Sequence, residues 1–178
     1  MDTKVKQLLG REQLKLAYSR VREFSELLCK PLKQDDFQIQ SIPQTSPPKW
    51  HIAHVSWFFE TFILTEYQAN YQTFCDKYDF LFNSYYYTHG NMHPRPKRGL
   101  LSRPTVDEIF QYRLFVDEKI HNLIDSVDES KWEEMAVRIV LGLHHEQQHQ
   151  ELLLMDVKHN FNCNPLKPAY REDLITLK

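Results

Sequence analysis

Apolar residues recur every three or four positions along most of the chain, which is the spacing of an amphipathic helix. The clearest early stripe consists of Leu14, Ala17, Val21, Phe24 and Leu28. Pro31 follows this stripe, and because proline interrupts a helix we expect the first helix to end there. The alternation of apolar and polar residues that is typical of strands is hard to find. The pattern therefore favours a chain built from helices.

The second expected helix begins where Ser46 precedes two prolines, Pro47 and Pro48. Proline is favoured in the first turn of a helix because its missing N–H would have no partner there. This helix is expected to run to about Asn70. It is apolar nearly all the way round, which predicts a central position in the fold. Its large apolar side chains include Trp57, Phe58, Phe59, Phe62, Ile63 and Leu64.

Two further helices are indicated by residues that cap helix starts. Thr105 is followed three residues later by Glu108, and Ser130 is followed by Glu133 in the same way. In such a capping box each side chain accepts a hydrogen bond from a backbone N–H that the helix leaves free. We expect the third helix to start at Thr105 and the fourth to run from Ser130 to about His159.

Two connections separate the first three helices, one over residues 33–45 and a long one over residues 71–103. Structureless loops of the second length are uncommon and usually functional. Four helices, one long crossover and no sheet signal predict an all-α fold, a four-helix bundle with a long crossover loop between helices 2 and 3. We assign residues 1–160 to this helical domain. Residues 161–178 are expected to form a polar tail or the start of a linker to a second domain.

The composition narrows the range of functions. The 178 residues carry a formal net charge of -2, which excludes a broadly basic nucleic-acid-binding protein. No apolar run is long enough for a transmembrane helix, and the first residues lack the apolar segment of a signal peptide. The three cysteines are far apart and odd in number, so we expect no disulfide framework and a reducing, cytoplasmic location.

The histidines supply the strongest chemical signal. His145 and His149 are four residues apart on the fourth helix, so both imidazoles lie on one face and can share a metal ion. On the second helix His51 and His54 are three residues apart, and either one is enough for a third ligand. Three histidines from two helices leave coordination positions open for a substrate or for oxygen. Gly142, one turn before His145, is expected to leave space above this site.

The same stretch also fits the His-Glu-x-x-His pattern of zinc peptidases, formed by His145, Glu146 and His149. In such an enzyme Glu146 is the general base, and a third ligand is needed downstream, for which Glu172 is the only plausible acid. Many peptidases of this kind hold their substrate along the edge strand of a sheet, and this chain predicts no strand. A peptidase is therefore the weaker interpretation.

Three blocks of the sequence occur together in a recognisable order. They are Ser-Pro-Pro-Lys-Trp-His-Ile-Ala-His at the start of residues 46–62, Arg-Gly-Leu-Leu-Ser-Arg-Pro-Thr at residues 98–105, and His-Glu-Gln-Gln-His-Gln-Glu-Leu at residues 145–152. The last block is followed by Asp156, Lys158 and His159. Together they resemble the N-terminal DinB-like domain of the ergothioneine sulfoxide synthases, over most of the chain from about Phe37 to Tyr170.

This resemblance implies a mononuclear non-haem iron(II) site whose ligands are His54, His145 and His149. Because three imidazoles suit several metals, zinc or nickel can substitute for iron. His51 is implied to support the ligands or to pack beside them. Glu151 lies roughly opposite His149 on the helix, so helix geometry argues against its being a ligand. A supporting, hydrogen-bonding role is expected for Glu151 instead.

The resemblance also implies the substrates. Members of the family use iron and O₂ to join the sulfur of a cysteine-containing thiol to the imidazole of hercynine, a trimethylhistidine. Gln148 resembles a family position near this histidine-derived substrate. Arg98 and Arg103 are the expected partners of substrate carboxylates, since guanidinium groups bind carboxylates through two parallel hydrogen bonds. Arg95 and Lys97 are further candidates for this role. The tyrosines at 85–87 are a further candidate wall of the pocket.

The full-length synthases carry a second domain, of the formylglycine-generating-enzyme type, that completes the pocket. The sequence contains none of that domain, so we expect metal binding here and catalysis only with such a domain or a separate chain. Two other interpretations stay open, a stand-alone DinB-like thiol transferase and a non-catalytic bundle that docks another chain. No nucleic-acid or membrane partner is expected.

Overall fold

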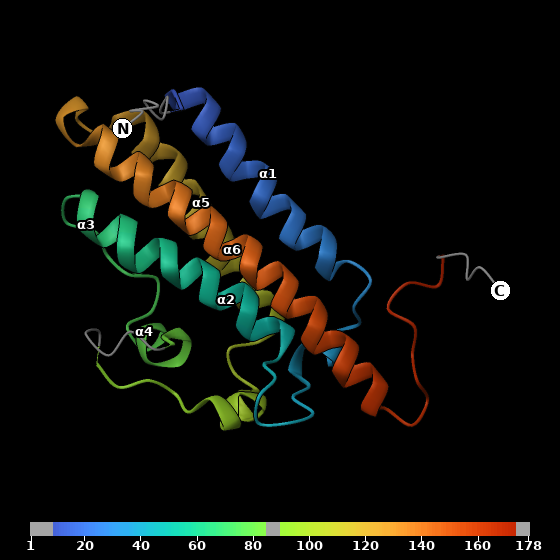
Figure 1. Cartoon of the computed structure of the whole chain (residues 1–178). Coiled ribbons are helices and arrows are strands. Elements are labelled where there is room, and N and C mark those ends of the chain that lie inside the picture. Colours follow the sequence, from blue (N-terminus) through green and yellow to red (C-terminus); the bar gives the residue numbers. More distant parts are fainter. Residues whose placement is uncertain (1–8, 85–89, 174–178) are drawn as a thin grey trace, which may run out of the picture.

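The computed structural model describes residues 9–84 and 90–173, and every regular element in these ranges is a helix (Figure 1). Four of them form the bundle: α1 (Arg11–Cys29), α2 (Pro48–Phe59), α5 (Val106–Ser126) and α6 (Glu129–Cys163). The prediction of an all-α four-helix bundle is confirmed. The fourth helix extends four residues beyond the expected end at His159.

The second helix lies at the centre of the bundle. Every residue of α2 is buried, and α2 packs against both α5 and α6. The helix continues through one π-helical turn, η2 (Glu60–Leu64), into the short α3 (Thr65–Tyr67). It therefore ends close to the expected position, but the π turn interrupts its regular period.

A buried carboxylate occupies the π turn and holds the start of the crossover. Glu60 accepts hydrogen bonds from the hydroxyls of Tyr71 and Tyr112, at 2.6 and 2.5 Å. It also accepts the backbone N–H of Phe74 at 2.9 Å. Because a buried carboxylate needs such donors, these contacts fix residues 71–74 against the bundle.

The long crossover between α3 and α5 contains helices of its own. They are α4 (Lys77–Phe82) and the 3-10 helix η4 (Arg95–Leu100). Another 3-10 helix, η1 (Gln34–Gln38), lies in the connection before α2. The crossover runs along the lower side of the bundle in Figure 1, where α4 packs against α2. It is thus an ordered wall beside α2 over its described residues, not the structureless loop that its length suggests.

The start of α5 has the capping box that the sequence predicts. The side chain of Thr105 accepts the backbone N–H of Glu108 at 3.2 Å, and the carboxylate of Glu108 accepts the N–H of Thr105 at 2.6 Å. These reciprocal bonds satisfy two of the N–H groups that a helix start leaves free.

The capping box predicted at Ser130 is wrong. α6 begins at Glu129, directly after Asp128, and no side chain caps its first turn. Arg11 of α1 donates to the carbonyl oxygen of Val127 at 2.9 Å and to the carboxylate of Glu129 at 3.1 Å. Arg11 of α1 thus holds the turn that leads into α6, and the helix begins one residue before the expected start at Ser130.

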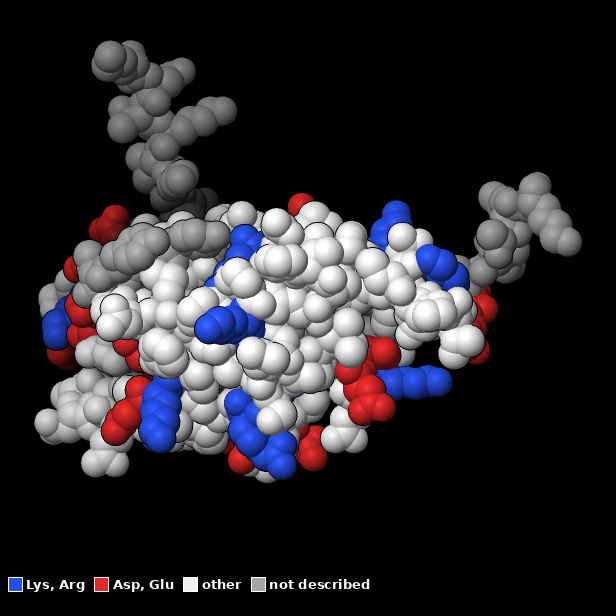
Figure 2. All heavy atoms as spheres, turned by 90° about the horizontal axis from the view of Figure 1, so that it is seen from below, with Lys and Arg blue, Asp and Glu red and all other residues white. Residues whose placement is uncertain are grey.

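The helices, the surface charges and the cysteines of the structure can be compared with what the composition predicts. No helix in the described part of the chain is both long and apolar enough to cross a membrane. The face seen in Figure 2 is mostly uncharged, with basic side chains both near its middle and along its edge and acidic side chains beside several of them. The cysteines are free, Cys29 being buried, Cys75 half-buried and Cys163 exposed, so the expected lack of a disulfide framework is confirmed.

Candidate metal centre

Three histidines from two helices meet between α2 and α6. His54 lies on α2, and His145 and His149 lie one turn apart on α6. Each offers one ring nitrogen, and these atoms all lie within 4.8 Å of one another. Nε2 of His54 and Nε2 of His145 are 3.2 Å apart. Two nitrogens that share a metal at about 2.1 Å are separated by about 3.0–3.4 Å, so the three histidines fit a metal ion.

Hydrogen bonds behind the rings indicate which nitrogens keep a lone pair. Nδ1 of His54 lies 2.6 Å from the carbonyl oxygen of Phe82, which can only accept, so Nδ1 donates and Nε2 keeps its lone pair. Nδ1 of His149 lies 2.9 Å from Nδ1 of His51. Nδ1 of His145 is buried without a hydrogen-bond partner in the described part of the chain. His145 is therefore oriented by packing, whereas the other two ligands are oriented by polar contacts.

Burial keeps these imidazoles neutral. It lowers the pKa of His145 to about 4. Burial and the charge of neighbouring histidines also lower the pKa values of His54 and His149 far below the ordinary value. Metals bind the neutral imidazole, so all three ligands are in the binding form at neutral pH. The group contains no carboxylate, which favours iron, zinc or nickel over magnesium or calcium.

Aromatic stacking holds the His54 ring in place. The ring lies between the indoles of Trp50 and Trp57, with centroids 4.6 and 5.5 Å away and planes tilted by 13° and 17°. The guanidinium of Arg98 lies over the Trp50 ring, 3.3 Å from its centroid. Arginine, indole, imidazole and indole thus form one continuous stack. His54 cannot rotate without moving large side chains.

A pocket of about 270 Å³ opens over the three histidines. Its wall includes Arg95 and Arg98 of η4 and the side chain of Gln148 of α6. The hydroxyls of Ser46 and Ser84 hold the guanidinium of Arg98 at 2.9 and 3.1 Å. The described residues that line the pocket include two arginines and no carboxylate. The pocket therefore favours an anionic ligand.

The structure brings Arg98 and Gln148 to this pocket but not Arg103. Arg103 is exposed and donates to the backbone carbonyl of its neighbour Ser102. It is not among the described residues that line the pocket, and the buried Lys49 contacts the same turn. The ammonium of Lys49 donates to carbonyl oxygens at residues 101 and 104, at 2.6 and 3.0 Å. The structure thus gives no support for a substrate contact at Arg103, which stays a prediction.

Two acidic residues from the sequence analysis also lie away from the histidines. Glu151 is on the exposed side of α6, and no hydrogen bond from its side chain to a described residue supports its expected role. Glu172 is exposed in the segment after α6 and is not part of the histidine group. The tyrosines at 85–87 lie outside the described residues.

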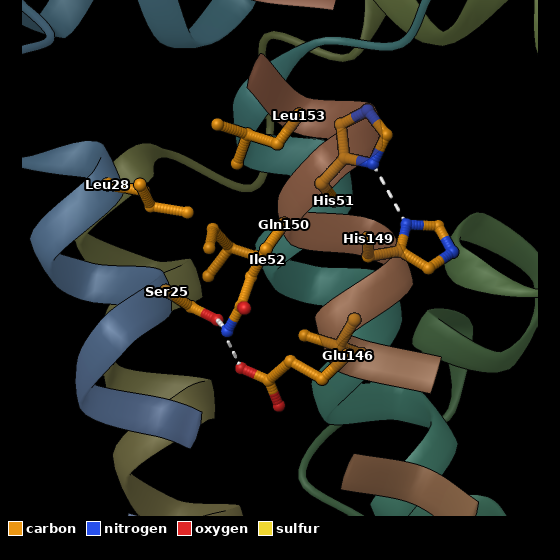
Figure 3. A pocket seen from close by; sticks show the side chains of 9 residues that line it. Ser25, Leu28, His51, Ile52, Glu146, His149, Gln150 and Leu153 are labelled. Carbon is orange, nitrogen blue, oxygen red and sulfur yellow. Dashed lines mark hydrogen bonds between the residues drawn. The ribbon is translucent and has the colours of Figure 1, made fainter. Parts of the chain in front are cut away.

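Glu146 turns away from the histidine group and into the bundle. Figure 3 shows its carboxylate directed at Ser25 of α1, whose hydroxyl donates to Oε1 at 2.6 Å. Arg113 donates to the same oxygen at 2.7 Å, and Arg22 donates to Oε2 at 2.9 Å. Burial alone would raise the pKa of Glu146, but the two arginines lower it to about 2. The carboxylate is thus engaged by residues of the bundle, and its position gives no support to the weaker interpretation, a peptidase in which Glu146 is the general base.

Gly142 allows a close aromatic contact and does not leave open space. A Cβ atom at this position would lie 2.6 Å from Cε1 of Phe59 and 3.1 Å from Cε1 of Phe58. The Phe58 ring also packs on the ring of His145, with centroids 4.5 Å apart. The expectation that Gly142 clears the space above the site is corrected. The glycine instead lets two phenylalanines approach α6, and one of them, Phe58, packs on the ring of His145.

Asp156 is the neighbour of the site whose role the sequence analysis missed. Its Oδ2 lies 3.0 Å from Nε2 of His51, the histidine that contacts His149. Asp156 follows His149 by seven residues, which is two helical turns, so it lies on the same face of α6. The seven-residue spacing of His149 and Asp156 could therefore have indicated that the two side chains share a face.

Comparison with known families identifies the fold family. The model of the DinB superfamily matches residues 17–153. The chain belongs to the DinB superfamily. All three candidate ligands of this DinB-superfamily chain, and the residues named above that line its pocket, lie inside the matched region. No curated protein matches the chain.

Proposed function

We propose that this DinB-superfamily chain is the iron(II)-binding module of an ergothioneine-type sulfoxide synthase. Such an enzyme joins a cysteine-containing thiol to hercynine with O₂. The observation that carries the proposal is the convergence of three neutral imidazoles beside a pocket lined by arginine. Three protein ligands leave coordination positions open for a substrate. The sequence blocks that resemble the synthases contain these histidines, together with Arg98 and Gln148.

The residues of the pocket have distinct roles in this proposal. Iron(II), when bound, supplies the chemistry with O₂. Arg95 and Arg98 attract the carboxylates of the two substrates and orient them over the histidines. The amide of Gln148 can both donate and accept, which suits the imidazole of hercynine. Trp50 and Leu152 provide the apolar part of the wall and limit the access of water.

A second domain or chain of the formylglycine-generating-enzyme type is proposed to close the pocket. Gln148 is exposed to solvent although it lines the pocket. A partner can therefore approach from this side and add the remaining substrate contacts. Carbon–sulfur bond formation is expected only with that partner, whereas metal binding is expected without it.

The first test is metal content after anaerobic reconstitution with iron(II). We expect about one iron per chain, and its loss in the variants His54→Ala, His145→Ala and His149→Ala. His144→Ala is the matched control, because His144 is exposed on the same helix and is not part of the histidine group. Stoichiometric iron in His54→Ala would eliminate the three-histidine site.

A stand-alone thiol transferase is the second candidate. It is favoured by the donor set, since three imidazoles without a carboxylate bind zinc or nickel as well as iron. The zinc-loaded chain would then conjugate a thiol to an electrophile without any second domain. Turnover in that assay would favour the transferase, and turnover only with iron, O₂ and a partner domain would favour the synthase.

A further inference from the structure

We propose that Asp156 and His51 form a hydrogen-bonded relay that positions His149 for metal binding. The relay runs from Oδ2 of Asp156 to Nε2 of His51, and from Nδ1 of His51 to Nδ1 of His149. The two distances are 3.0 and 2.9 Å. The inference rests on the proposed metal centre, but on neither the identity of the metal nor the reaction.

The chemistry of the three groups sets the direction of the relay. The carboxylate of Asp156 accepts, so Nε2 of His51 carries the proton that it donates. A neutral His51 then has a lone pair on Nδ1, which accepts the proton carried by Nδ1 of His149. This leaves the lone pair of His149 on Nε2, the nitrogen available to the metal. Without the relay, His149 is free to place its proton on either nitrogen.

The relay is buried and held at its far end. His51 is 3% exposed and Asp156 is 1% exposed, so water does not compete for these bonds. Oδ2 of Asp156 also accepts the backbone N–H of Ser46 at 2.8 Å. The hydroxyl of Ser46 in turn accepts from Arg98 at 2.9 Å. The segment that leads into α2 therefore fixes Asp156, and Asp156 fixes His51.

Figure 3 shows polar contacts on two sides of α6, one of which contains the His51–His149 contact of the relay. His51 and His149 point toward each other on one side, and Glu146 and Gln150 reach toward Ser25 of α1 on the other. A cavity of about 10 Å³, the size of a single water, lies between them. The ion pairs of Glu146 thus hold the helix, whereas the relay acts on one metal ligand.

The decisive variant is Asp156→Leu, which replaces the accepting carboxylate with an apolar side chain that can accept no hydrogen bond. Partners that orient a ligand histidine typically contribute 10–100-fold to metal affinity. We therefore expect cobalt(II) to bind about 10–100-fold more weakly, with a changed visible absorption spectrum of the bound cobalt. Asp156→Asn keeps an accepting oxygen, so its cobalt(II) affinity is expected to lie between those of the native chain and of Asp156→Leu. In the metal-free protein, NMR of the ring nitrogens is expected to show one tautomer of His149 in the native chain and both tautomers in Asp156→Leu.

Glu60→Leu is the matched control, because it removes another buried carboxylate, one that accepts three hydrogen bonds. Glu60 is 3% exposed, and its partners are Tyr71, Tyr112 and the N–H of Phe74. We expect it to lower stability and to leave the affinity and spectrum of bound cobalt(II) unchanged. An effect as large as that of Asp156→Leu would assign both effects to general loosening and overturn the relay.

If Asp156→Leu does not fold, two variants at His51 test the relay instead. The amide of His51→Gln can accept from His149 and donate to Asp156, whereas His51→Leu can do neither. We expect cobalt(II) affinity near that of the native chain in the first and a loss in the second. Equal, native-like affinity in both overturns the relay alone. A native chain that binds no cobalt(II) overturns the relay and the proposed metal centre together.

Discussion

Replacing Glu146 by glutamine tests whether this residue stabilises the helical bundle through its ion pairs or acts at the metal centre. The carboxylate is 1% exposed and is bound by Arg22, Arg113 and Ser25. Glutamine removes the negative charge between two buried guanidinium groups and directs an amide N–H at one of them. The loss is therefore electrostatic, with little change in volume.

Two independent arguments give the size of this loss. The pKa of Glu146 is lowered from 4.5 to about 2, and at 1.36 kcal/mol per pKa unit this corresponds to roughly 3 kcal/mol. Removing one partner of a buried ion pair typically costs about 3–5 kcal/mol. We expect Glu146→Gln to lower the free energy of unfolding by roughly 3–5 kcal/mol, a large share of the 5–15 kcal/mol typical of a domain.

The assay is urea unfolding at pH 7, followed by circular dichroism, with the metal removed by a chelator. Glu133→Gln is the control, because Glu133 is exposed on the same helix and should change stability by less than about 0.5 kcal/mol. Folded Glu146→Gln should still bind about one metal per chain, since the carboxylate points away from the histidines. A stability loss below about 1 kcal/mol, or loss of metal from folded protein, would refute this reasoning.

Other predictions follow from single contacts. Gly142→Ala should destabilise the chain by about 1–3 kcal/mol through overpacking against Phe58 and Phe59, and should weaken metal binding through His145, which calorimetric titration with zinc would measure. Because the pKa of Glu146 is lower in the folded state, its stabilisation is present above about pH 4.5 and is lost as the pH falls toward 2. Urea midpoints over this pH range should therefore fall more steeply for the native chain than for Glu146→Gln. Thr105→Ala should cost about 1 kcal/mol in urea unfolding and Ser130→Ala less than 0.5, since only Thr105 caps its helix. Zinc at 100 times its Kd should stabilise the fold by about 2.7 kcal/mol, seen as a rise in Tm that a chelator reverses.

The bundle was predictable because its signals are local. The three- and four-residue spacing of apolar side chains and the Thr105–Glu108 pair depend on residues within one or two turns of each other. The expected cap at Ser130 was wrong. The turn before α6 is instead contacted by Arg11, which is more than a hundred residues away in the sequence. The π turn was equally invisible, since Glu60 there is satisfied by Tyr112 of another helix.

The same distinction applies to the metal centre. The i, i+4 spacing of His145 and His149 predicted their shared face, because both residues lie on one helix. The role of Glu146 could not be inferred in this way. Its partners Arg22 and Arg113 lie 124 and 33 residues away in the sequence, so the peptidase pattern remained open until the ion pairs were seen.

The candidate metal ligands and the arginines of the pocket lie on different parts of the chain, and this affects how its function can change in evolution. The candidate ligands lie on α2 and α6, in the rigid bundle, whereas Arg95 and Arg98 reach the pocket from η4 in the crossover. Connecting segments tolerate substitution and insertion better than packed helices do. Changes in the crossover can therefore alter which molecule is accepted without disturbing the ligands. One inherited metal centre can in this way serve several reactions over evolutionary time.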